Sequence, residues 1–283
     1  MIAALRTTSS KVASFIRGED FWRGVVSIAV FLAFWEVGSR SLAWFGFAFP
    51  WVSQVPAPTA VLREMGRLVQ EWSFWNSAFL SSLRVFEGFF AAMVIGIPLG
   101  LAMAVSRTFY GITFPVFEVL RPIPPLAWVP ASIIFWPTQE LSIAFVTFLG
   151  AFFTIVINVI GGAQAIDVRY FQAARSMGSS TWDIFRRIIL PGTLPSIVVG
   201  ATVGVGITWA VVVAAEMISG GGSAGSVGGA AGGGLGFFIW NSYVGGSYTQ
   251  IVAGMISIGI AGYISSAVLR KIGQWMTPWL SES

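Results

Sequence analysis

Cysteine and histidine are both absent from this chain of 283 residues. Without Cys there are no disulfides and no thiol nucleophiles, and without His there are no imidazole bases and none of the commonest metal ligands. Charged residues are also scarce, at 10% of the chain, whereas a soluble domain carries about a quarter. Hydrophobic residues make up 55% of the sequence, and the mean hydropathy is +0.79. We therefore predict a protein embedded in a lipid bilayer, with no metal site and no catalytic residue.

Acidic residues are the minority among the few charges. The chain has 16 basic and 12 acidic residues, a formal net charge of +4, and 14 of the basic residues are Arg. In membrane proteins, Lys and Arg gather in cytoplasmic segments and so orient the chain. With the N-terminus inside and six spans, the inner segments hold eleven basic residues and the outer segments three. We therefore expect both termini in the cytoplasm and no nucleic-acid partner.

Long apolar segments predict about six transmembrane helices, because crossing the hydrocarbon core takes roughly 20 residues. The predicted spans are residues 24–38, 83–105, 112–136, 141–160, 195–218 and 250–269. The first follows a basic segment, as in a signal peptide, but no cleavage site of small residues stands out after it, so we expect an uncleaved anchor. The third contains five prolines, which predict a break in that helix.

On this topology the chain has four regions. They are a cytoplasmic segment, the first span with an external interfacial helix, a transmembrane core and a C-terminal tail, over residues 1–23, 24–78, 79–275 and 276–283. The interfacial helix is predicted over 59–72, where Arg and Glu alternate with apolar residues. Within the core, residues 219–236 are almost entirely Gly, Ser and Ala, and we interpret them as a flexible external connector.

A charged, helix-forming segment at residues 164–191, which we call the docking segment, separates the fourth and fifth spans and faces the cytoplasm on this topology. An Ala-Ala pair gives its first helix a smooth surface, and Gly178 is placed to end that helix. A hydroxyl residue within 179–181 is placed to cap a second helix. Pro191 then opens the next span, where a missing N–H is harmless. The pattern predicts a helix–turn–helix on the inner face of the membrane.

The docking segment resembles the EAA…G………I-LP signature of ABC-importer permease subunits, in which this loop docks the ATPase. The matching positions are Ala173, Ala174, Gly178, Leu190 and Pro191. Gln172 departs from the signature, because the family usually has Glu there.

Motifs outside this segment resemble the nitrate, sulfonate and taurine branch of these permeases, which also includes bicarbonate transporters. The motifs lie at residues 84–89, 96–100, 106–107, 120–128 and 215–217. Glycines four residues apart, at 96 and 100 and again at 200 and 204, are typical of helices that pack closely in lipid.

The resemblance implies an all-α, polytopic inner-membrane protein with the type I ABC-importer permease (MetI-like) fold, working as a homodimer. It implies ABC ATPase subunits and a periplasmic or lipid-anchored substrate-binding protein as partners. The chain has no Gly-Lys pair for a phosphate-binding loop, so ATP and Mg²⁺ are expected on the separate ATPase and no cofactor on this chain. The implied ATPase-docking residues are Gln172, Ala173, Ala174, Arg175, Gly178, Trp182, Leu190 and Pro191.

The Pro-rich break in the third span is the candidate translocation site. In lipid, unpaired backbone groups are tolerated only where they are buried in protein or line a water-filled cavity, and broken helices mark binding sites in transporters. Glu118 and Arg121 lie beside the break, three residues apart, and are placed to pair on one helical face. Such a pair either acts in the pathway as a gate or only neutralises the two charges for structural reasons. The predicted pathway or gate residues are Glu118, Arg121, Pro122, Pro124, Pro125, Trp128, Asn158 and Glu216.

For two of these residues the sequence allows more than one role. Asn158 either faces the pathway or bonds neighbouring helices together. Glu216 carries a negative charge that would repel an anion, so we expect a structural or outer-gate role for it. For Arg84 we predict an ion pair with Glu87.

Two other classes of protein remain as alternatives. An ion-driven secondary carrier or channel would show internal repeats and leave the docking segment without a role. An intramembrane enzyme would have to work without the His and Cys side chains that this chain does not contain. The cargo also stays open among nitrate, bicarbonate, taurine, alkanesulfonates, aromatic carboxylates and thiamine precursors.

Overall fold

The computed structural model describes residues 19–47, 50, 52–219 and 233–280. These residues form helices and no strands, as the all-α prediction requires. The chain divides into two compact units: an N-terminal unit of Met1–Gln70 and Gly246–Ala253, and a core unit of Glu71–Gly245 and Gly254–Ser283. The predicted cytoplasmic segment up to residue 18, most of the Gly-rich connector (220–232) and the end of the C-terminal tail (281–283) lie outside the described residues.

The N-terminal unit contains one helix long enough to span a membrane, α2. Its elements are α2 (Glu19–Ser39), α3 (Ser41–Phe45), η1 (Val52–Gln54) and α4 (Pro58–Leu68). Glu36 near the end of α2 pairs with Arg40 at 2.5 Å and accepts hydrogen bonds from the backbone N–H (3.1 Å) and hydroxyl (2.9 Å) of Thr59. These contacts join the end of the first span to the start of α4.

The short helix α4 is the predicted interfacial helix, and it ends four residues earlier than expected. Val61 and Leu68 are buried, whereas Glu64 and Arg67 bond to polar partners. Glu64 accepts hydrogen bonds from Arg67 (2.6 Å) and Gln250 (3.0 Å), and these bonds lower the pKa of its carboxyl.

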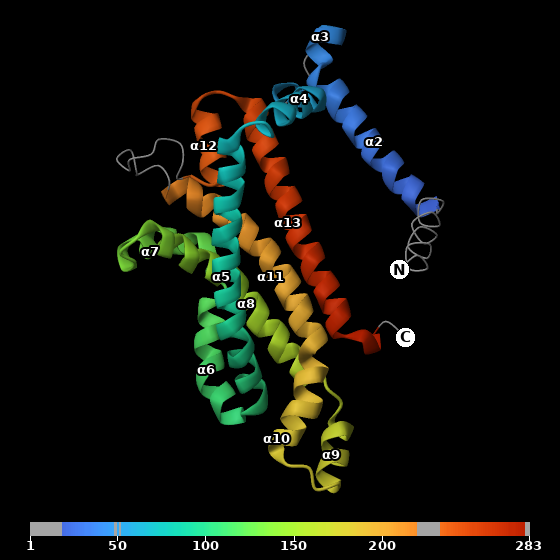
Figure 1. Cartoon of the computed structure of the whole chain (residues 1–283), viewed down its shortest axis with the longest axis vertical. Coiled ribbons are helices and arrows are strands. Elements are labelled where there is room, and N and C mark those ends of the chain that lie inside the picture. Colours follow the sequence, from blue (N-terminus) through green and yellow to red (C-terminus); the bar gives the residue numbers. More distant parts are fainter. Residues whose placement is uncertain (1–18, 48–49, 51, 220–232, 281–283) are drawn as a thin grey trace. The chain divides into compact units, whose positions relative to one another are not determined.

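The core unit is built around α8 (Gln139–Gln164), which packs against both α5 (Trp72–Val105) and α11 (Leu190–Ser219) (Figure 1). The remaining elements are α6 (Arg107–Leu120), η2 (Pro125–Trp128), α7 (Val129–Phe135), α9 (Val168–Ser176), α10 (Thr181–Ile184), η3 (Phe185–Ile189), α12 (Leu235–Val244), α13 (Tyr248–Met276) and η5 (Pro278–Leu280). In Figure 1, α9 and α10 lie at one end of α11, and α12 lies near its other end.

Glycines let the three central helices approach closely, as their spacing predicts. A Cβ added at Gly100 on α5 would lie 2.8 Å from the Cβ of Val159 on α8. A Cβ added at Gly200 on α11 would lie 2.8 Å from the Cβ of Asn158 on the same helix α8. Because no side chain fits at these distances, the backbones of α5 and α11 lie directly against α8 at these glycines.

Five helices among the described residues are long and apolar enough to cross a bilayer: α2, α5, α8, the helix through α11, and α13. The predicted third span, 112–136, is wrong as a single helix, because α6 ends at Leu120 and only short helices follow. The predicted break is confirmed: Pro124 has extended backbone (ψ 135°), as expected for a residue that precedes another proline. The ten-residue helix α12 was not predicted.

Candidate coupling surface and translocation site

The first half of the docking segment folds as predicted. Helix α9 begins after Asp167, whose carboxylate accepts a hydrogen bond from the N–H of Arg169 (2.8 Å). The chain leaves the helix at Gly178, where φ is +75°, a conformation that residues with a Cβ rarely adopt. The N–H of Ser179 then donates to the carbonyl of Ala174 (3.0 Å), which satisfies one of the last carbonyls of the helix. Gly178 therefore ends this helix, as predicted.

Ser180 caps the second helix, α10. Its hydroxyl accepts a hydrogen bond from the N–H of Asp183 (3.1 Å), and the Asp183 carboxylate accepts one from the N–H of Ser180 (3.3 Å). This reciprocal pair satisfies two N–H groups at the helix start. The prediction of a hydroxyl cap within residues 179–181 is therefore confirmed.

Pro191 does not open a new helix, and that prediction is wrong. The helix runs on from Thr181 into α11 through a π-helical turn at Phe185–Ile189, where the N–H of Leu190 donates to the carbonyl of Phe185. Pro191 has no N–H for the carbonyl four residues before it, so the ordinary helical ladder cannot continue through this point. The wider turn lets the helix pass the proline. The second helix of the docking segment and the fifth span are thus one continuous element.

Most of the implied docking residues lie on the surface of the core unit. The exposed ones are Gln172, Ala173, Arg175, Gly178 and Trp182. Trp182 is 66% exposed and stacks on Phe185 with ring centroids 5.5 Å apart. Ala174 is buried, while Leu190 and Pro191 are half-buried at the start of α11. The segment therefore presents both apolar and basic side chains that no described residue of this chain covers.

The Pro-rich break lies beside a cavity of about 220 Å³ in the core unit. Two of the predicted pathway residues line it, together with side chains of α8 and α11: the lining is Arg121, Pro125, Leu149, Gly150, Phe153, Thr154, Ile157 and Ile207. Arg121 is the only charged residue in this lining. The remaining predicted pathway residues are absent from the lining. Among them, Pro122 and Pro124, which flank Ile123 in the sequence, are both exposed.

Arg121 and Glu118 form the predicted pair. Nη2 of Arg121 donates to Oε1 of Glu118 at 3.1 Å, and the two side chains are 41% and 46% exposed. An exposed pair of this kind contributes about 0–1 kcal/mol to stability. The weak contact leaves the guanidinium accessible to other partners.

Trp128 and Asn158 contact other parts of the core unit. Trp128 is half-buried against Phe145, with ring centroids 6.4 Å apart, and its indole N–H is buried without a hydrogen-bond partner among the described residues. The Asn158 side chain donates to the carbonyl of Thr154 (2.8 Å) on its own helix and lies against Gly200 of α11. These contacts place Asn158 at one of the close approaches between α8 and α11.

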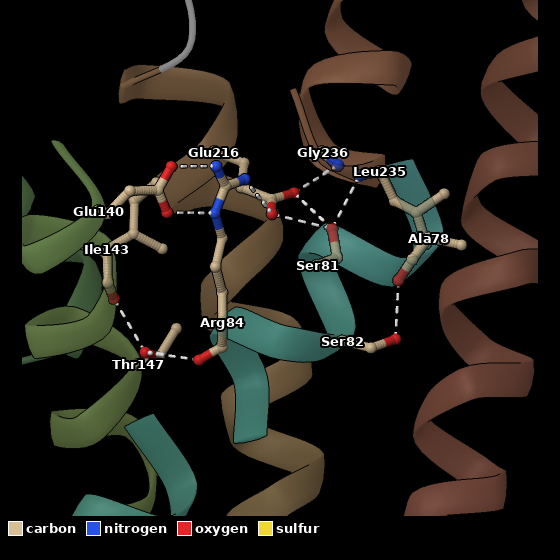
Figure 2. A network of polar contacts seen from close by, with 10 residues as sticks. All are labelled: Ala78, Ser81, Ser82, Arg84, Glu140, Ile143, Thr147, Glu216, Leu235 and Gly236. Atoms are coloured by element: carbon tan, nitrogen blue, oxygen red, sulfur yellow. Dashed lines mark hydrogen bonds and ion pairs between the residues drawn. The ribbon is translucent and has the colours of Figure 1, made fainter. Parts of the chain in front are cut away.

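A buried ion network joins α5, α8 and α11, and sequence reasoning missed most of it (Figure 2). Arg84 donates twice to Glu140 on α8, from Nε at 2.8 Å and from Nη2 at 2.5 Å. Its Nη1 donates to Glu216 on α11 at 2.9 Å. We predicted Glu87 as the partner of Arg84; the side chain of Glu87 is exposed instead, and Arg84 pairs with carboxylates from two other helices.

Glu216 and Ser81 also hold the start of α12. The Ser81 hydroxyl donates to the Glu216 carboxylate (2.8 Å) and accepts from the N–H of Leu235 (2.8 Å), while the N–H of Gly236 donates to Glu216 (2.9 Å). Gly234, at the N-cap position, has no side chain to do this. Glu216 is only 1% exposed, so it acts as a buried acceptor between helices, which agrees with the first of the two roles expected of it, structural or outer gate.

Comparison with known proteins decides the family. Residues 96–282 match the inner membrane component of binding-protein-dependent transport systems. The nitrate import permease protein NrtB of Synechocystis sp. is 34% identical over 274 residues, which cover 94% of this chain and 92% of NrtB. The taurine transport system permease protein TauC of Escherichia coli is 30% identical over 233 residues, 81% of each chain. This chain belongs to that ABC permease family.

The fold of the permease agrees with this assignment. A chain of the MetNI methionine ABC transporter, solved in an inward-facing conformation, superposes with a TM-score of 0.62 at 21% identity. The match covers 73% of the permease and 97% of that chain. The predicted type I fold is therefore confirmed, as is the nitrate and taurine branch of permeases to which the sequence motifs pointed.

Proposed function

We propose that this permease is the membrane subunit of an ATP-driven importer for a small anion, of the nitrate, sulfonate/taurine or bicarbonate type. Two copies form the pathway in the bacterial inner membrane, with both termini in the cytoplasm. Separate ATPase subunits bind ATP and Mg²⁺, and a periplasmic or lipid-anchored protein delivers the anion. The permease itself makes and breaks no covalent bond.

One observation carries this proposal: the chain matches nitrate and taurine permeases over most of its length while its docking segment stays exposed. An exposed helix–turn–helix with Trp182 and Arg175 on its surface suits a protein partner, because buried aromatic and Arg side chains dominate most interfaces. An ion-driven carrier would leave this surface without a partner.

The continuous helix from Thr181 to Ile218 supplies the mechanical link. When the ATPase subunits close, they displace the docking segments of both copies, and each displacement passes along this helix into the core. Because α11 is packed against α8, the bundle moves as a body from an inward-open to an outward-open state. Return to the first state releases the anion into the cytoplasm.

The names of the relatives support nitrate and sulfonates as cargo, and the binding protein sets the final choice among small anions. Another small organic solute, such as an aromatic carboxylate or a thiamine precursor, is the alternative. Uptake assays with the cognate binding protein, comparing nitrate, bicarbonate and taurine, separate these possibilities.

Substitution of Gly178 tests the docking role. We expect Gly178→Trp to abolish ATP-dependent uptake and to lower recovery of the ATPase with the affinity-purified permease at least tenfold, while membrane insertion persists. Gly178→Asn is the matched control, because Asn tolerates φ near +75° better than other residues with a Cβ. No described atom lies within 4 Å of a Cβ built at Gly178, so a Cβ at this position meets open space among the described residues.

Two results would contradict the proposal. One is normal uptake in Gly178→Trp. The other is a wild-type permease that retains no ATPase on purification and moves solute against a gradient by itself in liposomes.

A further inference from the structure

Two arginines of the core unit, Arg84 and Arg121, have opposite surroundings. Arg84 is 6% exposed and bonded to two carboxylates, with Nε and both terminal nitrogens donating. Arg121 is 41% exposed, and its hydrogen bond in the described structure is one contact of 3.1 Å, from Nη2 to Glu118. A guanidinium carries five N–H donors in a planar fork that matches a planar or tetrahedral oxyanion. Arg121 therefore has donors available for a ligand, whereas those of Arg84 serve the fold.

The surroundings of Arg121 also suit a small ligand. The cavity it lines has a volume of about 220 Å³, below the roughly 300–1,000 Å³ of pockets for drug-sized molecules. Its other walls are apolar apart from Thr154, and they include Leu149, Phe153 and Ile207. A positive charge beside apolar walls acts more strongly on an anion than the same charge in water.

The carboxylate of Glu118 binds the guanidinium of Arg121 in the way that an anionic ligand would. This carboxylate is a planar oxyanion, it is held by a single hydrogen bond, and it is half exposed, so it can leave for solvent at little cost. It also lies outside the residues that line the cavity. Release of this carboxylate frees Arg121 without leaving a buried, unpaired charge.

From this arrangement we propose that the cavity is a selectivity site for a small oxyanion, in which the anion replaces the carboxylate of Glu118 at the guanidinium of Arg121. The inference rests on the proposed function and extends it, because it gives the permease a choice between anions and neutral solutes that is independent of the binding protein. Nitrate and short sulfonates fit the charge, the hydrogen-bond geometry and the volume.

Methanesulfonate and dimethyl sulfone test the proposal, since they have nearly the same size and both carry methyl groups, but only the first is charged. Saturation-transfer NMR on the permease in nanodiscs, with any ATPase it retains and without the binding protein, detects weak binding of each. We expect saturable binding of methanesulfonate that nitrate displaces, and no displacement by dimethyl sulfone. We expect Arg121→Ala to weaken this binding at least tenfold and Arg121→Lys to weaken it less.

Glu118→Gln gives a result that a merely structural role would not. Removal of the competing carboxylate charge should tighten methanesulfonate binding roughly two- to fivefold, the range expected for loss of an exposed ion pair. Arg107→Ala is the matched control, because it removes the same charge from the other end of α6, and it should bind like the wild type.

The inference is overturned if wild-type permease binds both probes equally, if Arg121→Ala binds methanesulfonate as tightly as wild type, or if Arg107→Ala weakens binding as much as Arg121→Ala. If Arg121→Ala does not fold, the Glu118→Gln variant decides instead. The inference is then overturned if Glu118→Gln binds methanesulfonate no more tightly than the wild type. Failure of the proposed function is distinguishable, because it appears as loss of ATPase association and of ATP-dependent uptake while probe binding persists.

Discussion

At the scale of single residues, the pair of Arg84 and Glu216 is the one whose disruption we expect to destabilise the fold strongly. Both side chains are almost fully buried, and Glu216 also accepts hydrogen bonds from Ser81 and Gly236. Breaking such a pair by removing one partner typically costs about 3–5 kcal/mol, because the other charge stays buried and unpaired. Glu140 differs, since its side chain is 63% exposed and regains water when it is released.

We therefore predict that Arg84→Met is strongly destabilising and that a second change, Glu216→Gln, restores much of the loss. The neutral amide removes the unpaired charge and can still accept hydrogen bonds from Ser81 and Gly236. Thermal unfolding of the purified variants in one detergent, followed by tryptophan fluorescence, gives the ranking.

The exposed partner provides the control for this comparison. Glu140→Gln should cost less than about 1 kcal/mol, in the range of exposed ion pairs. A double variant that unfolds at a lower temperature than Arg84→Met alone would show that buried charge is not the dominant cost.

At the scale of elements, α12 depends on two other helices for its N-terminal cap. Its N-cap residue is Gly234, and the first N–H groups bond instead to Ser81 of α5 and Glu216 of α11. The start of a helix leaves four N–H groups without partners, and satisfying them from neighbouring helices fixes where α12 begins.

Ser81→Ala should loosen α12 selectively. Loss of a cap costs about 0.5–2 kcal/mol, so the backbone amides of the first turn of α12 should exchange hydrogen roughly 2- to 30-fold faster. Hydrogen exchange with mass spectrometry on the purified permease measures this directly.

The neighbouring serine is a matched control for that experiment. Ser82 donates to the carbonyl of Ala78 in its own helix, at 2.7 Å (Figure 2). Ser82→Ala should therefore leave exchange in α12 unchanged. Equal acceleration in both variants would mean that α5 as a whole, rather than the Ser81 hydroxyl, controls α12.

At the scale of the whole molecule, the orientation of the chain in the membrane decides which surfaces meet which partners. The eleven-to-three excess of basic residues in the inner segments of the six-span topology predicts that the docking segment faces the cytoplasm. The same predicted topology has α12 outside. Because the chain contains no Cys, single cysteines can be introduced without removing others.

We predict that a membrane-impermeant maleimide labels Val244→Cys in intact spheroplasts and labels Met177→Cys only after the membrane is permeabilised. Both positions are well exposed, at 71% and 78%, so accessibility in the fold does not limit labelling. Labelling of Met177→Cys in intact spheroplasts would reverse the topology and with it the side on which the ATPase docks.

The sequence by itself determined that the chain is an all-α membrane protein, and it determined where the first helix of the docking segment ends and which residue caps the second, but not that the second helix continues through Pro191 into α11. Hydropathy is a sum over adjacent residues, and the contacts at Gly178 and between Ser180 and Asp183 join residues at most five apart, so local composition and spacing suffice. The family signature depends on the same short spacings.

Only the tertiary structure decided which charges pair and where a cavity forms. Arg84 meets Glu140 and Glu216 across 56 and 132 residues of sequence, and the cavity beside Arg121 needs side chains from both α8 and α11. Sequence spacing favoured Glu87 as the nearer partner. Helix packing overrode it, because three helices in close contact at glycines bring Arg84 between two carboxylates from other elements.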